Sequence, residues 1–356
     1  MKSAVFYGNE QIKIEERPNA KVGPRMAKAK IAYCAICGSE ANLFSHPRMG
    51  QPNKRIAELG LENQGPFAWG HECAGVIVEV GKEVTALKVG DRVAINPIVS
   101  CGKCHYCRNG LGNICEAGYA LIGSALDGGM AETICLPQEN FYVIPDDMTL
   151  EDASLVQCGA VSFGSVMDSG IKMGETALVI GVGTIGLMTV QALLVAGARR
   201  IIAADIAPHK LQMAKDFGAT HTIDAKEDVC AFVRELTDGR GVDFVYECAG
   251  AEASMLNAVM CVRKRGTIMV ESVFYDKVPV PGIPFLQREV NVTTSVSPFA
   301  GRYDYMVELA HQGKMDAKKL LTKRVDLDHT LDGFHALRDD KSQIKVMIDV
   351  DPSLGK

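Results

Sequence analysis

The sequence predicts an α/β protein with a β-rich first part and a parallel, doubly wound sheet in its second part. The hydrophobic pattern changes near residue 155, and a glycine-rich turn follows the first strand after that point. Before residue 155, short β-rich runs alternate with turns that contain Pro and Gly, as in an all-β unit with long loops. After it, apolar strands alternate with helical patterns, which is typical of a parallel sheet covered by helices.

The expected elements follow from these patterns in chain order. In the first part, β-rich runs lie at 27–36, 73–81, 91–95, 131–136 and 140–145. In the second part, we expect strands at 176–183, 199–205, 220–225, 242–250 and 267–272, and helices at 184–198, 208–219, 229–239 and 253–266. The elements that follow, two helices (303–314 and 330–340) and a strand (344–350), do not continue this alternation of strands and helices. We therefore expect a first domain, 1–155 joined by 295–356, and a second domain, 156–294.

Composition narrows the functional class. The 356 residues carry a formal net charge of −5 and 47% hydrophobic residues, which suits two globular cores. No basic run suggests nucleic acid as a partner. The N-terminus has no apolar signal-peptide region, and no window of 18 apolar residues predicts a membrane span. We expect a cytoplasmic protein with a small-molecule partner.

A dinucleotide-binding turn is predicted at VIGVGTIG. Gly181, Gly183 and Gly186 have G-x-G-x-x-G spacing, with Thr184 and Ile185 between them, after an apolar strand and before a helical pattern. The first glycine allows the tight turn, the second lets the backbone approach a pyrophosphate, and the third lets helix and strand pack closely. The alternative is a tight strand–helix turn without a ligand.

An acidic residue ends the next strand. Asp205 lies 19 positions after Gly186, where it would accept hydrogen bonds from ribose hydroxyls and repel a 2′-phosphate. No Arg follows it closely, and His209 and Lys210 are the nearest cations. NAD is therefore favoured over NADP.

Four of the twelve cysteines cluster in CGKCHYCRNGLGNIC. Cys101, Cys104, Cys107 and Cys115 have the spacing C-x2-C-x2-C-x7-C, and four thiolates can close a tetrahedral structural zinc site. An iron–sulfur cluster is disfavoured by the last spacing and by the absence of a following proline, and a disulfide pair is disfavoured in a reducing compartment. Most of the scattered cysteines are interpreted as small core residues.

A second set of possible metal ligands lies in two motifs, ICGSE at 36–40 and WGHECAG at 69–75. Cys37, His71 and Glu72 supply thiolate, imidazole and carboxylate, and three protein ligands leave a zinc position open for substrate oxygen. Zinc there is a Lewis acid that lowers the pKa of an alcohol, and Ser39 could relay its proton. A redox pair of Cys34 and Cys37, or a structural role for His71, are the alternatives.

These residues resemble the zinc-containing medium-chain dehydrogenases, the alcohol and polyol dehydrogenase superfamily. The resemblance runs nearly end to end through CGS at 37–39, GHE at 70–72, 79–93, the cysteine lobe, 128–133, 145–155, GVGTIG and 344–350. It implies a GroES-like catalytic domain plus a Rossmann domain, with an active site in the cleft between them, two zinc ions per chain and a homodimer or homotetramer.

The resemblance also assigns residues. It implies Cys37, His71 and Glu72 as catalytic zinc ligands, and Lys345 as the basic residue that approaches Glu72 or the pyrophosphate. It places Val270, Ser272, Ser295 and Val296 at the backbone that holds the nicotinamide amide. Two positions depart from the family: the fourth ligand position falls on Gln157, beside Cys158, and Glu40 stands where Asp is usual.

Several functions remain open. The favoured one is NAD-dependent oxidation of a secondary alcohol such as a polyol or sugar alcohol, as in the sorbitol and threonine dehydrogenase branches. Primary-alcohol and L-threonine oxidation are alternatives, and a non-catalytic zinc- and nucleotide-binding protein is the alternative of another class. A zinc-free enone reductase is disfavoured by the cysteine lobe and by Asp205. The long segment 44–69 is expected to line the substrate cleft, to form an oligomer contact or to be a surface insertion.

Overall fold

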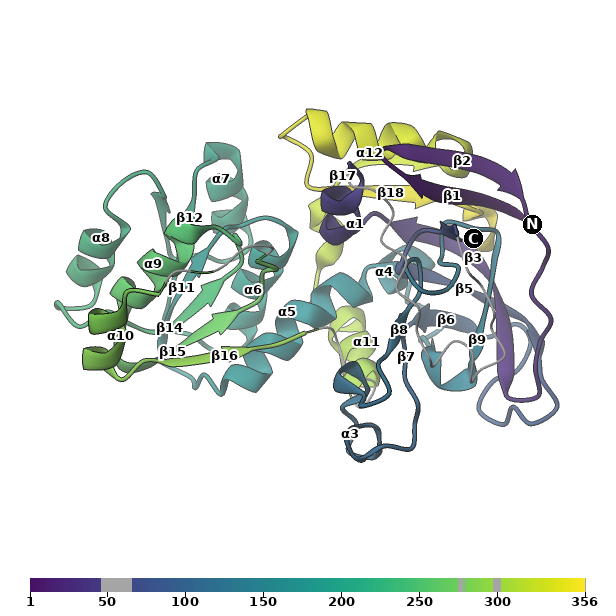
Figure 1. Ribbon diagram of the computed structural model, residues 1–356, viewed down its shortest axis with the longest axis horizontal. Coiled ribbons are helices and arrows are strands. Elements are labelled where there is room, and N and C mark those ends of the chain that lie inside the picture. Colours follow the sequence, from purple (N-terminus) through teal and green to yellow (C-terminus); the bar gives the residue numbers. More distant parts are fainter. Residues whose placement is uncertain (46–65, 275–277, 279, 297–301, 356) are drawn as a thin grey trace. The chain divides into compact units, whose positions relative to one another are not determined.

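The chain forms two compact units (Figure 1). The computed structural model describes residues 1–45, 66–274, 278, 280–296 and 302–355. One unit comprises Met1–Ala160 and Ser297–Lys356, and the other comprises Val161–Val296. The first boundary lies within helix α5 (Val156–Ser169), five residues after the expected position. Within the described residues, no helix is both long and apolar enough to cross a membrane.

The first unit is built on a mixed β-sheet. Its strands follow the order β10-β6-β5-β3-β18-β17, and β9 pairs with β3 as well. Their bounds are β3 Met26–Ala35, β5 Glu72–Val80, β6 Arg92–Ile95, β9 Thr133–Pro137, β10 Phe141–Val143, β17 Leu321–Asp326 and β18 Lys345–Asp349. Strand β3 buries alternate side chains such as Ala27, Ala29 and Ile31 in the core, as a pleated strand requires. The C-terminal strand β18 pairs with β3 and so belongs to this unit.

Smaller sheets and helices complete this unit. Strands β1 (Lys2–Gly8), β2 (Gln11–Glu16) and β4 (Phe67–Ala68) form one sheet, and β7 (Ile98–Val99) pairs with β8 (Ala120–Leu121). The ring of Trp69 lies 3.6 Å from that of Phe6 and 5.1 Å from that of Phe334, so that aromatic packing joins β1 to helix α12. The helices are α1 Gly38–Leu43, α3 His105–Arg108, α4 Leu150–Ser154, α11 Tyr303–His311 and α12 Thr330–Asp339.

The second unit contains six parallel strands in the order β13-β12-β11-β14-β15-β16. Helices α6 and α7 contact each other, as do α8, α9 and α10 in sequence. The strand order reverses between β11 and β14, where α/β proteins bind their ligands at the carboxyl ends of the strands. The elements are β11 Thr176–Ile180, α6 Thr184–Val195, β12 Arg200–Asp205, α7 Pro208–Asp216, β13 His221–Asp224, α8 Val229–Leu236, β14 Val242–Glu247, α9 Glu252–Cys261, β15 Val262–Val270, α10 Gly282–Arg288 and β16 Asn291–Thr294.

One expected helix is wrong in its last five residues. The helix expected at 253–266 ends at Cys261, and Val262 already begins strand β15. Parallel pairing of Val262 with Val242 fixes this strand, so the sheet overrides the helical pattern of Val262–Gly266. Of the segment 44–69, residues 46–65 lie outside the described residues.

Candidate active site

Cys37, His71 and Glu72 come together in the first unit. Strand β3 leads into Cys37, which precedes helix α1, and Glu72 begins strand β5 after His71. Antiparallel pairing of Ala35 with Glu72 brings these segments side by side. The three donor atoms lie within 4.8 Å of one another, and His71 and Glu72 are 5% and 0% exposed. Thiolate, imidazole and carboxylate at this spacing fit a zinc ion with an open position.

Glu40 orients this set from the first turn of α1. Its carboxylate accepts hydrogen bonds from the backbone N–H of Gly70 (2.9 Å) and Cys37 (3.1 Å), and it lies 3.1 Å from Nδ1 of His71. Burial alone would lower the pKa of His71, but the charges of Glu40 and Cys37 outweigh it and raise that pKa well above its ordinary value. The longer acidic side chain thus still reaches Nδ1 of the histidine, and a metal would bind at Nε2 in place of a proton.

Lys345 pairs with Glu72 in the interior. Its Nζ lies 2.8 and 2.7 Å from the two carboxylate oxygens of Glu72 and donates to the carbonyl of Ile36 at 3.3 Å. Both side chains are almost fully buried. Burial would lower the pKa of Lys345, but the negative charge of Glu72 raises it above its ordinary value, so the lysine stays charged. Lys345 was expected to approach either Glu72 or the pyrophosphate. In the first unit it pairs with Glu72.

Of three further candidate residues, Ser39 contacts Cys37, and Cys158 lies within range of the charges of Glu72 and Cys37. The hydroxyl of Ser39 donates to Sγ of Cys37 at 3.2 Å and is exposed. Gln157 is buried on helix α5, and the adjacent Cys158 donates its thiol to the carbonyl of Leu155 at 3.2 Å. Burial raises the pKa of Cys158 to about 12, so its thiol is neutral. Among the described His, Cys, Asp and Glu residues, the donor group comprises Cys37, His71 and Glu72 and leaves Cys158 outside.

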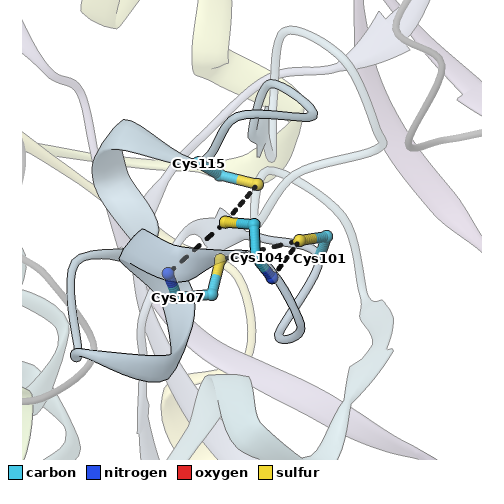
Figure 2. Close-up of side chains that lie close together, drawn as sticks. All are labelled: Cys101, Cys104, Cys107 and Cys115. Carbon is cyan, nitrogen blue, oxygen red and sulfur yellow. Dashed lines mark hydrogen bonds between the residues drawn. The ribbon is translucent and has the colours of Figure 1, made fainter.

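The four lobe cysteines converge on one point, as Figure 2 shows. The Sγ atoms of Cys101 and Cys107 lie 3.8 Å apart, and those of Cys104 and Cys115 lie 4.0 Å apart. Helix α3 begins directly after Cys104, whose sulfur accepts the backbone N–H of Cys107 at 3.5 Å. This and a bond from Glu116 lower the pKa of Cys104 to about 6. The donor set fits a closed tetrahedral zinc site, and His105 is not part of it.

The glycine turn joins β11 to α6 in the second unit. Gly181 has φ +87°, and a Cβ there would lie 2.8 Å from Ala249. A Cβ on Gly186 would lie 2.0 Å from the carbonyl oxygen of Gly181, whereas one on Gly183 would meet no atom within 4 Å. Gly183 is the residue before helix α6, which starts at Thr184 and Ile185. The turn therefore presents open backbone at a helix N-terminus, which suits a pyrophosphate.

Asp205 ends β12 beside this turn. Its carboxylate is 8% exposed and accepts the backbone N–H groups of Val182 (2.8 Å) and Ala207 (2.9 Å). These bonds fix the carboxylate and leave further lone pairs for a sugar hydroxyl. Lys210 lies in the first turn of α7, half-buried, next to the exposed His209.

The segments expected at the nicotinamide lie side by side. Val270 ends β15 and pairs with Thr294 at the end of β16, so that Ser272 and residues 295–296 follow neighbouring parallel strands. The hydroxyl of Ser272 donates to Glu247. Ser295 is half-buried and Val296 is exposed.

Comparison with known proteins decides the family. Residues 23–146 match the alcohol dehydrogenase GroES-like domain, and residues 184–312 match the zinc-binding dehydrogenase domain. The chain is 33% identical over 352 residues to a sorbitol dehydrogenase of Bacillus subtilis, covering 98% of this chain and 97% of the relative. It is 30% identical to D-xylulose reductase A of Aspergillus oryzae, covering 97% and 96%. The chain belongs to the zinc-containing medium-chain dehydrogenase/reductase superfamily.

A solved relative supports the fold of this dehydrogenase. The crystal structure of 2R,3R-butanediol dehydrogenase from Bacillus subtilis superposes with a TM-score of 0.89 at 30% identity, over 98% of this chain and 99% of the other. The predicted fold class, a GroES-like domain plus a Rossmann domain, is thereby confirmed, as is the prediction that the protein is an oxidoreductase of the alcohol dehydrogenase type.

Two acidic residues of this dehydrogenase were not among the expected site residues: Glu247, which is buried, and Glu271, which is half-buried. Glu247 ends β14, and its Oε1 accepts the backbone N–H groups of Ala249 and Gly250 and the hydroxyl of Ser254. Glu271 follows β15, accepts the hydroxyl of Thr189 at 2.7 Å, and has its pKa raised to about 7 by burial. Both follow or end apolar parallel strands, and that position next to the nucleotide turn is the signal that could have found them.

Proposed function

We propose that this dehydrogenase oxidises a secondary alcohol of the polyol class, or reduces the corresponding ketone, with NAD as hydride carrier. The grouping of Cys37, His71 and Glu72 within 4.8 Å, with His71 and Glu72 buried, carries the proposal. The names of the relatives, sorbitol dehydrogenase, D-xylulose reductase and butanediol dehydrogenase, support a substrate with neighbouring hydroxyl groups.

The residues of the site have separate roles in the proposed reaction. A zinc ion held by Cys37, His71 and Glu72 would supply Lewis acidity at the substrate oxygen, and a bound dinucleotide would serve as hydride acceptor. Glu40 holds the ring of His71, and Lys345 neutralises Glu72, so that the donor set keeps its geometry in a buried setting. Ser39 is exposed beside Cys37, and we assign it the transfer of the alcohol proton towards solvent.

NAD is the cofactor that Asp205 supports. A fixed carboxylate at the end of β12 accepts ribose hydroxyls and repels a 2′-phosphate. Gly181, Gly183 and Gly186 form the pyrophosphate turn, with Thr184 and Ile185 at the helix start. The neighbouring Lys210 would lie on the adenosine side of a bound dinucleotide, and Val270, Ser272, Ser295 and Val296 would flank its nicotinamide amide. The second zinc is assigned to the four lobe cysteines.

A matched set of serine variants tests this proposal. Zinc per chain and turnover are measured for the native protein and for Cys37→Ser, Cys104→Ser and Cys135→Ser, with sorbitol, xylitol, 2,3-butanediol, L-threonine and ethanol. We expect two zinc ions in the native protein. Cys37→Ser should retain its fold and the lobe zinc and should lose turnover by at least about 100-fold.

The remaining outcomes are equally informative. Cys135→Ser, at a half-buried position outside both donor sets, should match the native protein. Full activity of Cys37→Ser would remove the assigned zinc role. One zinc per native chain with no turnover on any substrate would favour a non-catalytic zinc- and nucleotide-binding protein. A preference for ethanol or L-threonine would move the substrate class to primary alcohols or amino-acid alcohols.

We also infer a cytoplasmic homodimer or homotetramer. Strand β16 is the last strand of its sheet and is exposed throughout, and Ile283 and Leu286 on α10 are 70% and 77% exposed. A strand edge without a partner strand among the described residues, and exposed apolar side chains, are features that oligomers cover. Light scattering on the purified protein at several concentrations gives the oligomeric state, and a monomer at all of them would contradict the inference.

A further inference from the structure

Two cysteines outside both metal sites face each other in the second unit. Cys230 is the second residue of α8, and Cys261 is the last residue of α9. Their Sγ atoms lie 2.8 Å apart. Helices α8 and α9 contact each other, and both belong to the same unit. The two sulfurs are therefore held together by the packing of α8 against α9.

The two thiols differ in burial. Cys261 is 0% exposed and belongs to the apolar core, whereas Cys230 is half-buried at the margin of that core. The sulfur of Cys230 also lies 4.0 Å from the carbonyl of Asn257 on α9, which keeps it over its partner. A reagent from solvent can thus reach the sulfur of Cys230 first.

The groups around Cys230 and Cys261 give the two thiols different reactivities. The hydrogen bond from Cys261 lowers the pKa of Cys230, and the charges of Arg234 and Arg288 act in the same direction, against burial and Asp228. The same hydrogen bond and burial raise the pKa of Cys261. The outer sulfur is therefore the nucleophile, and the inner one holds the proton.

We propose that Cys230 and Cys261 form a thiol-modification site that reacts with low-molecular-weight disulfides and closes to an intramolecular disulfide. The thiolate of Cys230 attacks one sulfur of the reagent, forms a mixed disulfide and releases one thiolate. The sulfur of Cys261 then displaces the second thiol from Cys230. The two cysteines lose two electrons and two protons, and the reagent disulfide is reduced to two thiols.

Closure needs little movement. The sulfurs must approach from 2.8 Å to the roughly 2.05 Å of a disulfide bond, which small χ1 rotations on two packed helices can provide. The bond would close the chain from Cys230 to Cys261, including strand β14. A cross-link over such a loop restricts the unfolded chain, so the oxidised protein should melt about 5–10 °C higher.

The test uses the full-length, zinc-loaded protein treated with glutathione disulfide, then alkylated and digested with trypsin. We expect the peptide 227–234 to be linked to the peptide 241–263, with the loss of two hydrogens. The second peptide also contains Cys248, so fragmentation must assign the bond to Cys261. Cys34 and Cys73, which pair across β3 and β5 and are buried, should remain free thiols and serve as the internal control.

Single variants separate the two steps. Cys261→Ser should accumulate a glutathione adduct on Cys230, and Cys230→Ser should show no modification at Cys261, with turnover of Cys230→Ser unchanged. If Cys261→Ser does not fold, Cys261→Ala replaces it, and the native peptide map alone still decides. A stable mixed disulfide on Cys230 in the native protein, or both cysteines recovered as free thiols, would overturn the proposal.

Discussion

At the scale of single residues, Lys345 and Glu72 form a buried ion pair in the first unit. Their side chains are 0% and 1% exposed, and the ammonium lies within 2.8 Å of both carboxylate oxygens. A buried ion pair contributes little net stability, but removing one partner leaves an uncompensated charge in a medium of low polarity.

In the zinc-free protein, Lys345→Met should therefore lower the free energy of unfolding by about 3–5 kcal/mol, because Glu72 loses its counter-charge. Denaturant titration of the native protein and the variant measures the difference. The double variant Glu72→Gln/Lys345→Met should recover much of the loss, since neither side chain of this pair is then charged. Lys2→Met is the matched control, because the pair of Lys2 and Asp328 is exposed and should change stability by less than about 1 kcal/mol.

A second residue-scale prediction concerns Glu271, whose pKa burial raises from 4.5 to about 7. Below pH 4.5 the carboxyl is protonated in both folded and unfolded chains. Between pH 4.5 and 7 only the folded chain keeps the proton, so stability falls as pH rises, and above pH 7 the loss is complete. The whole effect is at most about 3 kcal/mol.

Glu271→Gln cannot titrate and should escape this loss. Its stability relative to the native protein should rise between pH 5 and pH 7 and stay level from pH 7.5 to pH 8.5, as measured by urea unfolding at each pH. The exposed residue Glu227, changed to Gln, should show no such trend. A constant difference between Glu271→Gln and the native protein across this range would show that the carboxyl titrates alike in both states.

At the scale of elements, the three glycines between β11 and α6 make separable predictions. Gly186→Ala would place a Cβ 2.0 Å from the backbone of Gly181 and should lower the melting temperature by several degrees or prevent folding. Gly183→Ala meets no atom within 4 Å and should melt like the native protein, yet bind NADH at least about tenfold more weakly, because its methyl group occupies the backbone's approach to pyrophosphate.

Calorimetry and NADH fluorescence titration measure both properties of these alanine variants. Gly282→Ala, at the start of α10 with no atom within 4 Å of its new Cβ, is the neutral control. If Gly183→Ala bound NADH as tightly as the native protein, the pyrophosphate would not lie over this turn.

The strands also show how much of the fold the sequence could predict. The buried parallel strands β11, β12 and β14 are apolar runs bounded by turn residues, and each lies within its expected range. Strands β16 and β17 were not predicted, because β16 has four exposed residues and β17 has mostly exposed ones, so no alternation marks them. They become strands through pairing with β15 and β18, a long-range contact that local patterns do not contain.

The residues of the candidate site also differ in how far the sequence alone could predict them. Cys37, His71 and Glu72 could be named from their chemistry and motif spacing, and the four lobe cysteines from their spacing alone. The role of Glu40 depends on its contact with His71, 31 residues away. The partner of Lys345 depends on where β18 pairs with β3, more than 300 residues along the chain from one another. Such contacts follow from topology and need the structure.

At the scale of the whole molecule, the path of the chain makes the two units unequal. The second unit is one continuous segment, Val161–Val296, with its own six-stranded sheet and core. The first unit is discontinuous: β17 and β18 lie in its main sheet, and Lys345 neutralises Glu72 in its interior. The first unit therefore cannot complete its core until the last sixty residues have been synthesised.

The two units should accordingly differ when expressed separately. The segment 161–296 should fold alone, with a cooperative thermal transition and NADH binding, because all its strand partners are local to it. The segment 1–160 should not, since without β18 one edge of β3 is unpaired along Cys34 and Ala35 and Glu72 is a buried charge without a partner. Circular dichroism and amide hydrogen exchange measure both. Co-expression of 1–160 with 297–356 should restore protected amides in β3, and protection in 1–160 alone would show that β18 is dispensable.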